Sequence, residues 1–235
     1  MKKYIFSDLD KSLIFSSRSI PDKVKSSSIC CFSRGCDNSR GLWVPKPYLD
    51  MINSLDGEIV IVTAREKKDV DKLELPFNYS YLICNFGAEV YGNDRRLNTL
   101  FNNEDAVLMS DFIALLSENN LSKPLKYNLV NDLPAVAHYV FSTESEAKEE
   151  FERIKGGTSA LKDRLSYQIN GRHFDIFPRN CGKEKSVEWL IKNFFQAPAF
   201  YFGVGDSIID HEFLKLCDIA ITPTNSQLFN NIGEN

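Results

Sequence analysis

The stretch that decides the fold comprises residues 4–13, with the sequence YIFSDLDKSL. An apolar run at residues 4–7 predicts a short buried strand, and Asp8 and Asp10 follow at its carboxyl end. Two carboxylates at the tip of a buried strand are costly unless they are paired, neutralised or bound to a metal. Ligands of open α/β sheets bind just beyond the carboxyl ends of the strands. We therefore interpret this acidic turn as part of a ligand site.

The composition is typical of a globular domain in water. A length of 235 residues allows one large domain, or a core with a smaller insert. A net charge of -4 argues against a nucleic-acid scaffold. The N-terminus lacks the apolar region of a signal peptide, and no apolar run is long enough to span a bilayer. We therefore expect a cytoplasmic protein without a disulfide framework.

Strand and helix patterns alternate along the first and last parts of the chain. Apolar runs at residues 58–62 and 81–84 predict two more buried strands, with a charged helix between them. Residues 183–195 predict a helix, and residues 199–204 predict a further strand. This alternation indicates an α/β fold with a mostly parallel, Rossmann-like sheet and helices on both faces.

The middle of the chain has a different pattern, in which two helices alternate with two hairpins. The hairpin signal is strong at Asn170-Gly171-Arg172. An α+β insert of this size can form a small domain. We therefore expect a discontinuous core of residues 1–90 and 175–235, interrupted by an inserted α+β domain of residues 91–174.

Residues 15–44 are polar and rich in turn residues, and we interpret them as a flap-like excursion over the mouth of the site. The excursion contains Cys30, Cys31 and Cys36. Their spacing is not that of a paired Cys-x-x-Cys zinc site, and no histidine is near them. We favour a flap with incidental cysteines over a zinc site.

Further polar side chains stand where other predicted strands end or where a helix begins. They are Thr63 after residues 58–62, Lys183 at the start of the 183–195 helix, and Asp206 and Asp210 after residues 199–204. A single residue of this kind is usually a turn residue or a helix cap. Their combination with Asp8 and Asp10, in this order, indicates one catalytic site.

These residues resemble the motifs of the haloacid dehalogenase (HAD) superfamily of phosphohydrolases. Residues 8–12 match its Asp-x-Asp-x-(Thr/Ser) turn, and residues 205–210 match its Gly-Asp-x-x-x-Asp turn. Thr63 matches the Thr or Ser at a strand end, and Lys183 matches the motif lysine, for which Lys185 is the competing choice. The insert resembles the α/β cap of the Cof-type and sucrose-phosphatase-type branch. Residues 85–88 resemble the Asn-Gly-Ala segment of that branch with one residue inserted.

The resemblance implies a magnesium-dependent phosphatase for a small phosphorylated metabolite, such as a sugar phosphate or phospho-sugar acid. It implies that Asp8 is the nucleophile and forms an aspartyl-phosphate, and that Asp10 is the general acid and base. Thr63 and Lys183 would hold the transferring phosphoryl oxygens. The implied Mg2+ ligands are Asp8, the backbone carbonyl of Asp10, Asp206 and Asp210. The candidates for substrate contacts are Arg65, Asn85, Lys183, Arg172 and Asn180.

The chain departs from the branch at two positions in the motifs. Lys11 stands where glycine is usual, and Ile209 replaces an asparagine. A hexose-phosphate phosphomutase and a non-catalytic phospho-ligand binding or regulatory module are the alternatives. The expected partner is a small phosphate ester, with neither nucleic acid nor membrane. Nothing in the pattern distinguishes a monomer from a homodimer.

Overall fold

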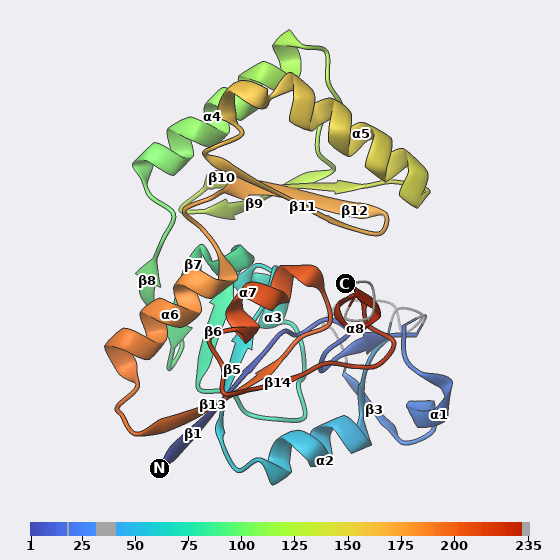
Figure 1. The fold of residues 1–235 in the computed structure, drawn as a ribbon, viewed down its shortest axis with the longest axis vertical. Helices are drawn as coiled ribbons and strands as arrows, with labels where there is room; N and C mark the ends of the chain where they lie inside the picture. Colours follow the sequence, from blue (N-terminus) through green and yellow to red (C-terminus); the bar gives the residue numbers. More distant parts are fainter. Residues whose placement is uncertain (18, 32–40, 232–235) are drawn as a thin grey trace. The chain divides into compact units, whose positions relative to one another are not determined.

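A computed structural model describes residues 1–17, 19–31 and 41–231 of the chain (Figure 1). The chain forms two compact units. The first contains Met1–Asn98 and Lys183–Asn235, and the second contains Thr99–Gly182. Both boundaries lie later in the chain than residues 90 and 174, where the sequence placed them.

The first unit is built on a seven-stranded sheet with the order β14-β13-β1-β5-β6-β7-β8 (Figure 1). At its centre, β1 (Lys2–Ser7) pairs in parallel with β13 (Ala199–Val204) and with β5 (Glu58–Val62). Parallel pairing continues from β5 to β6 (Tyr81–Cys84) and from β13 to β14 (Ile219–Ile221). The predicted α/β fold with a mostly parallel sheet is confirmed.

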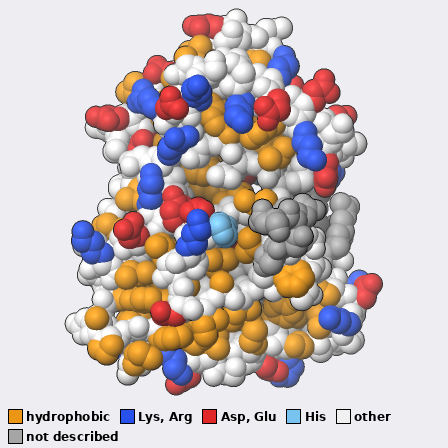
Figure 2. Space-filling view, in the orientation of Figure 1, with side chains coloured by type: hydrophobic (Ala, Val, Ile, Leu, Met, Phe, Trp, Pro, Cys, Tyr) orange, Lys and Arg blue, Asp and Glu red, His pale blue; other side chains and the backbone are white. Residues whose placement is uncertain are grey.

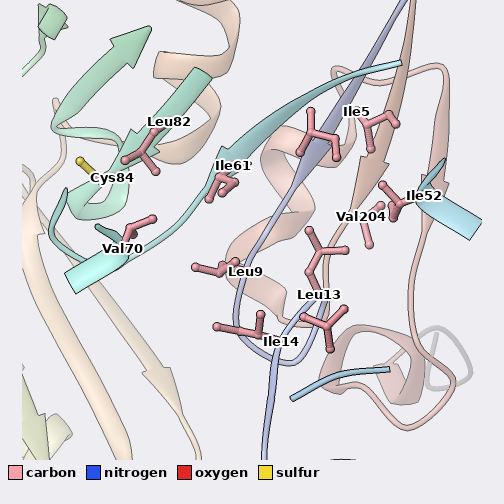
Figure 3. Packing of buried hydrophobic residues seen from close by; sticks show 12 residues of the cluster. Ile5, Leu9, Leu13, Ile14, Ile52, Ile61, Val70, Leu82, Cys84 and Val204 are labelled. Carbon is pink, nitrogen blue, oxygen red and sulfur yellow. The ribbon is translucent and has the colours of Figure 1, made fainter. Parts of the chain in front are cut away.

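Side chains of β1 are buried on both faces of this sheet. Ile5 packs with Ile52 of α2 (Lys46–Ser54) and with Ile61 on one face, and Figure 3 shows these side chains grouped with Leu9 of the acidic turn. Tyr4 and Phe6 pack on the other face against α6 (Lys183–Phe194) and α7 (His211–Leu214). Helices therefore cover both faces, with the short α3 (Lys67–Val70) following β5.

The later first boundary has a structural reason at Gly92-Asn93-Asp94, a turn at the start of the insert expected at residues 91–174. This turn joins β7 (Glu89–Gly92) to β8 (Arg95–Thr99), and both strands belong to the central sheet. Asn93 and Asp94 have φ values of 50° and 58°. Consecutive left-handed residues are typical of tight hairpin turns. The turn therefore returns the chain to the core sheet.

The excursion after the acidic turn forms a small antiparallel sheet with the order β2-β4-β3. Its strands are β2 (Phe15–Ser16), β3 (Ser28–Cys31) and β4 (Leu42–Pro45), and α1 (Asp22–Lys25) lies between the first two along the chain. Cys36 lies outside the described residues, so the interpretation of the three cysteines stays a prediction.

The second unit has a four-stranded antiparallel sheet with the order β11-β12-β10-β9. Its elements are α4 (Asn103–Glu118), β9 (Lys126–Val130), β10 (Leu133–Val140), α5 (Glu144–Gly157), β11 (Leu165–Asn170) and β12 (His173–Pro178). A capping box begins α5, because Thr143 Oγ1 accepts from Glu146 N at 3.2 Å and Glu146 Oε2 accepts from Thr143 N at 3.3 Å. Phe174 stacks on Tyr139 and meets Phe151 of α5 edge-on, which joins sheet to helix.

Acidic and basic side chains are interspersed over the face of the molecule shown in Figure 2. Within the described part of the chain, including the short α8 (Gln227–Asn231), every helix is too short or too polar to cross a membrane.

Candidate active site

The register of β1 and β13 brings the first and last acidic motifs together. Ser7 and Val204 are partners at the carboxyl ends of these parallel strands. Asp8 is the next residue after β1, and its N–H donates to Val204 O at 2.9 Å. Asp206 follows β13 by two residues. Both carboxylates are buried at the same edge of the sheet, as the strand-end rule predicts.

Lys183, the first residue of α6, joins two of these carboxylates. Its Nζ lies 2.7 Å from Asp8 Oδ1 and 2.7 Å from Asp210 Oδ1, and all three side chains are buried. Burial alone would lower the pKa of Lys183, but Asp210 and Asp8 outweigh it and hold this pKa above its usual value. This geometry favours Lys183 over Lys185 as the motif lysine, and the assignment stays a prediction.

Asp210 organises the loop that carries Asp206. Its Oδ2 accepts hydrogen bonds from Asp206 N at 3.2 Å, Ser207 N at 3.0 Å and Ser207 Oγ at 2.8 Å. Because its Oδ1 is bound to Lys183, both carboxylate oxygens already have partners. Asp210 therefore supports the site by fixing Lys183 and Asp206.

Gly205→Ala is expected to damage this arrangement. A Cβ at Gly205 would lie 2.7 Å from Asp210 Cβ, so Asp210 would have to move away from Lys183. We expect the unfolding free energy to fall by about 1–3 kcal/mol and turnover to fall by about tenfold or more. Urea unfolding and phosphate release measure the two effects.

Gly156→Ala, in α5, is the matched control because a Cβ there meets nothing within 4 Å. It should leave turnover unchanged and stabilise α5 slightly. Equal losses of turnover in the two variants would contradict the role given to Gly205.

The acidic cluster has the composition of a hard-cation site. Asp8, Asp206 and Asp210 offer ligand atoms that all lie within 4.8 Å of one another. When all three carboxylates are ionised, the ammonium of Lys183 balances only one of their negative charges. Burial, followed by the charge of Asp210, raises the pKa of Asp206 to about 6. Burial likewise raises the pKa of Asp8, opposed by Lys183. A divalent cation with oxygen ligands would hold these groups ionised, so the residues fit Mg2+.

Asp10 is directed to a different partner. Its Oδ2 accepts from Arg65 Nε at 2.7 Å, and its Oδ1 accepts from Arg65 Nη2 at 2.6 Å. This two-point contact fixes the plane of the carboxylate, as bidentate arginine pairs do. Arg65 N also donates to Thr63 Oγ1 at 3.2 Å. The loop after β5 therefore carries both the motif threonine and the partner of Asp10.

Lys11 occupies the glycine position of the first motif with a left-handed backbone, at a φ of 61°. A non-glycine residue pays about 1–2 kcal/mol for this conformation. Its positive charge opposes the rise in the pKa of Asp206. A cavity of about 290 Å³ adjoins this position and is lined by Lys11, Phe15, Ser19, Asp206, Pro223, Asn225, Ser226 and Gln227.

The other candidates for substrate contacts have structural partners. Asn85 is buried in the first unit, where its Nδ2 donates to Glu89 Oε2 at 2.9 Å. In the second unit, Arg172 donates to Ser142 O at 3.3 Å, and Asn180 Nδ2 donates to Leu100 O at 2.9 Å. These contacts do not test the substrate role, which stays a prediction.

Three residues that contact segments near the site were not singled out by the sequence: Ser186, Ser207 and Glu89. Ser207 forms a capping box with Asp210, which the spacing of the two residues allows one to recognise. Ser186 Oγ donates to Gly87 O, which lies 99 positions earlier in the chain, and Glu89 accepts from Asn85. No local sequence pattern marks either residue.

No protein-family model matches the sequence, and no curated protein matches it. Solved structures do share its fold. Sucrose-phosphatase from Synechocystis sp. PCC6803, in complex with sucrose and phosphate, is 12% identical with a TM-score of 0.53, over 100% of this chain and 97% of that chain.

A HAD subclass IIB sugar phosphatase is 12% identical with a TM-score of 0.58, over 98% of this chain and 91% of that chain. A haloacid dehalogenase-like hydrolase from Bacteroides thetaiotaomicron is 13% identical with a TM-score of 0.61, over 97% and 90%. The chain therefore has the fold of the HAD phosphatases, and its structural neighbours come from the branch that its motifs resemble.

Proposed function

We propose that this protein is a HAD-type phosphatase that hydrolyses a small phosphorylated metabolite through an aspartyl-phosphate on Asp8. The observation that carries this proposal is the contact of Lys183 with Asp8 and Asp210, both at 2.7 Å, beside Asp206. Four residues from three distant parts of the chain converge on one buried point. Their charges suit a phosphoryl group and a divalent cation.

The first half of the reaction uses Asp8 and Asp10. A carboxylate oxygen of Asp8 bonds to phosphorus while the bond from phosphorus to the leaving oxygen breaks. Asp10 gives its proton to that oxygen, so the product leaves as an alcohol. Lys183 and Thr63 hold the phosphoryl oxygens and stabilise their negative charge during the transfer.

The second half returns Asp8 to its starting state. Asp10, now ionised, takes a proton from a water molecule whose oxygen attacks phosphorus. The bond between phosphorus and Asp8 breaks, and inorganic phosphate is released. Arg65 contacts both oxygens of the ionised Asp10 and so orients this carboxylate to accept the proton.

Asp8 and Asp206 would hold Mg2+, together with the backbone carbonyl of Asp10, and Asp210 would fix the loop around them. Bound Mg2+ supplies the positive charge that phosphoryl transfer requires next to clustered carboxylates. Chelation should therefore abolish turnover, and added Mg2+ should restore it.

A sugar phosphate or phospho-sugar acid is the proposed substrate class. The sugar and sucrose phosphatases of the same fold support this choice. The test is phosphate release from a panel of sugar phosphates and phospho-sugar acids with Mg2+, for the wild type and Asp8→Asn. Free phosphate from the wild type alone is the expected result. No phosphate from any ester, or isomerisation of a sugar 1-phosphate without phosphate release, would contradict the proposal.

The stability of the metal-free protein is expected to depend on the ionisation of Asp206. Its pKa is about 6 in the fold against 3.8 as the ordinary value, so the folded state binds more protons between these pH values. The contribution of Asp206 to stability is therefore present below about pH 4 and is lost as pH rises through about 6. Urea unfolding in chelator from about pH 4 to 7 measures this loss.

Asp206→Asn isolates the effect, because asparagine does not titrate. As pH rises, the wild type should lose unfolding free energy relative to Asp206→Asn. A difference that stays constant over this pH range would show that Asp206 does not titrate as proposed.

A further inference from the structure

Glu89 is a buried carboxylate that the proposed reaction does not use. It begins β7 and is 6% exposed. Its Oε2 accepts from Asn85 Nδ2 at 2.9 Å, and its Oε1 accepts from Tyr91 Oη at 2.8 Å and lies 3.3 Å from Arg96 Nη1. A carboxylate in this position is tolerated only because donors surround it. The arrangement fixes the side chain of Asn85.

Asn85 opens a strained turn. Asn85, Phe86 and Gly87 have φ values of 51°, 56° and 93°, so two non-glycine residues in succession are left-handed. This conformation is unfavourable for a residue that carries a Cβ. A conformation of this kind persists only where neighbouring contacts enforce it, and it often marks a functional site.

The left-handed turn directs two backbone N–H groups at the loop after β5. Asn85 N donates to Arg65 O at 2.9 Å, and Phe86 N donates to Thr63 O at 3.3 Å. On its other side, Gly87 O accepts from Ser186 Oγ at 2.5 Å. Ser186 lies one turn along α6 from Lys183. The turn therefore contacts the segments that carry Thr63, Arg65 and Lys183.

A continuous series of contacts leads from Glu89 to Asp10. Glu89 holds the side chain of Asn85, the backbone of Asn85 holds Arg65, and the Arg65 guanidinium makes its two contacts with Asp10 at 2.6 and 2.7 Å. Every member belongs to the first unit. A shift of the turn would therefore move the guanidinium that orients Asp10.

We propose that Glu89 is a positioning residue for the general acid and base Asp10, acting through Asn85 and Arg65. This inference rests on the proposed function. It predicts that loss of Glu89 impairs proton donation to the leaving oxygen more than it impairs attack by Asp8. An ester with a poor leaving group should then suffer more than an ester whose leaving group departs without a proton.

Phenyl phosphate and p-nitrophenyl phosphate separate these two effects, because they have similar shapes and the nitro group makes the second a better leaving group. The quantity to compare is kcat/KM, which covers the steps up to leaving-group departure. Well-placed general acids contribute about 10²–10⁴-fold. We expect Glu89→Ala to lower kcat/KM about tenfold or more for phenyl phosphate and about threefold or less for p-nitrophenyl phosphate.

Three further variants complete the experiment. Glu89→Gln keeps an oxygen that can accept from Asn85 and should restore most of the lost activity on phenyl phosphate. Asn85→Gly removes the same hydrogen bond, keeps a backbone suited to a positive φ, and should reproduce the effect of Glu89→Ala even where that variant folds poorly. Tyr91→Phe removes another hydrogen bond to Glu89 and should leave the ratio of the two kcat/KM values unchanged.

The outcomes distinguish this inference from the proposed function. If the wild type hydrolyses both esters and Asp8→Asn hydrolyses neither, but Glu89→Ala and Asn85→Gly lower both kcat/KM values equally, only the inference is overturned. Equal damage from Glu89→Gln and Glu89→Ala on phenyl phosphate would also overturn it. If the wild type hydrolyses neither ester nor any member of the metabolite panel, the proposed function fails, and the inference fails with it.

Discussion

Lys183→Met is expected to lower the unfolding free energy of the metal-free protein by about 3–5 kcal/mol. Lys183 is the cation that contacts both Asp8 and Asp210 at 2.7 Å inside the fold. Methionine has a similar length but no charge, so two buried carboxylates would lose their ionic partner. Breaking a buried ion pair is costly because the remaining charge has no compensation. Activity should be lost as well, since the phosphoryl oxygens lose a positive contact.

Urea unfolding in chelator measures the effect, and Lys192→Met is the matched control on the same helix. Lys192 is an exposed residue in the last turn of α6, so its substitution should cost less than about 1 kcal/mol. Saturating Mg2+ should recover part of the stability lost by Lys183→Met, because the cation compensates the same carboxylates. Equal losses in the two lysine variants would contradict the central position of Lys183.

Asp8→Asn is expected to lower kcat by about 10³-fold or more, as removal of a catalytic nucleophile does. The amide cannot form the aspartyl-phosphate, although its size is almost the same. The unfolding free energy in chelator should stay the same or rise, because a buried negative charge is removed from a cluster with excess negative charge. Loss of activity together with retained stability separates a chemical role from a structural one.

Phosphate release and urea unfolding measure these two effects. Asp218→Asn is the control, because Asp218 is an exposed acid directly before the start of β14, where its Oδ2 accepts from Tyr201 N at 2.8 Å. It should keep its turnover. Turnover by Asp8→Asn close to that of the wild type would show that another group is the nucleophile.

Much of the site could be predicted because it depends on local pattern and parallel pairing. β1 and β13 are both apolar strands followed by acidic residues. Because these parallel strands are neighbours, Asp8 and Asp206 lie at the same edge of the sheet. Lys183 could be predicted because it opens a helix next to the core. The capping box of α5 is likewise a local pattern, since both of its members lie within one turn.

Other features depend on geometry that spacing does not reveal. The sequence Gly92-Asn93-Asp94 indicates a turn but not the sheet to which the next strand belongs. Only the strand pairing shows that β8 stays in the core sheet. Arg65 was a candidate for substrate contacts, but its guanidinium meets Asp10, which lies 55 positions away along the chain. The burial of Glu89 could not be predicted, because an acidic residue at the start of a strand is usually exposed to solvent.

The left-handed backbone of Lys11 was predicted only in part. The sequence marked it as unusual because glycine is common at that position, and the structure gives it a φ of 61°. The turn thus keeps the conformation that glycine would adopt, at a cost, and adds a positive charge near Asp206.

The proposed reaction places a covalent phosphoryl group on Asp8, which borohydride trapping can detect. Borohydride reduces an acyl phosphate to an alcohol, so Asp8 would become homoserine during turnover. Peptide mass spectrometry of protein quenched with borohydride during turnover should find homoserine at Asp8, dependent on both substrate and Mg2+. Steady turnover with an unmodified Asp8, or with homoserine at the position of another acidic residue, would show that Asp8 is not the nucleophile.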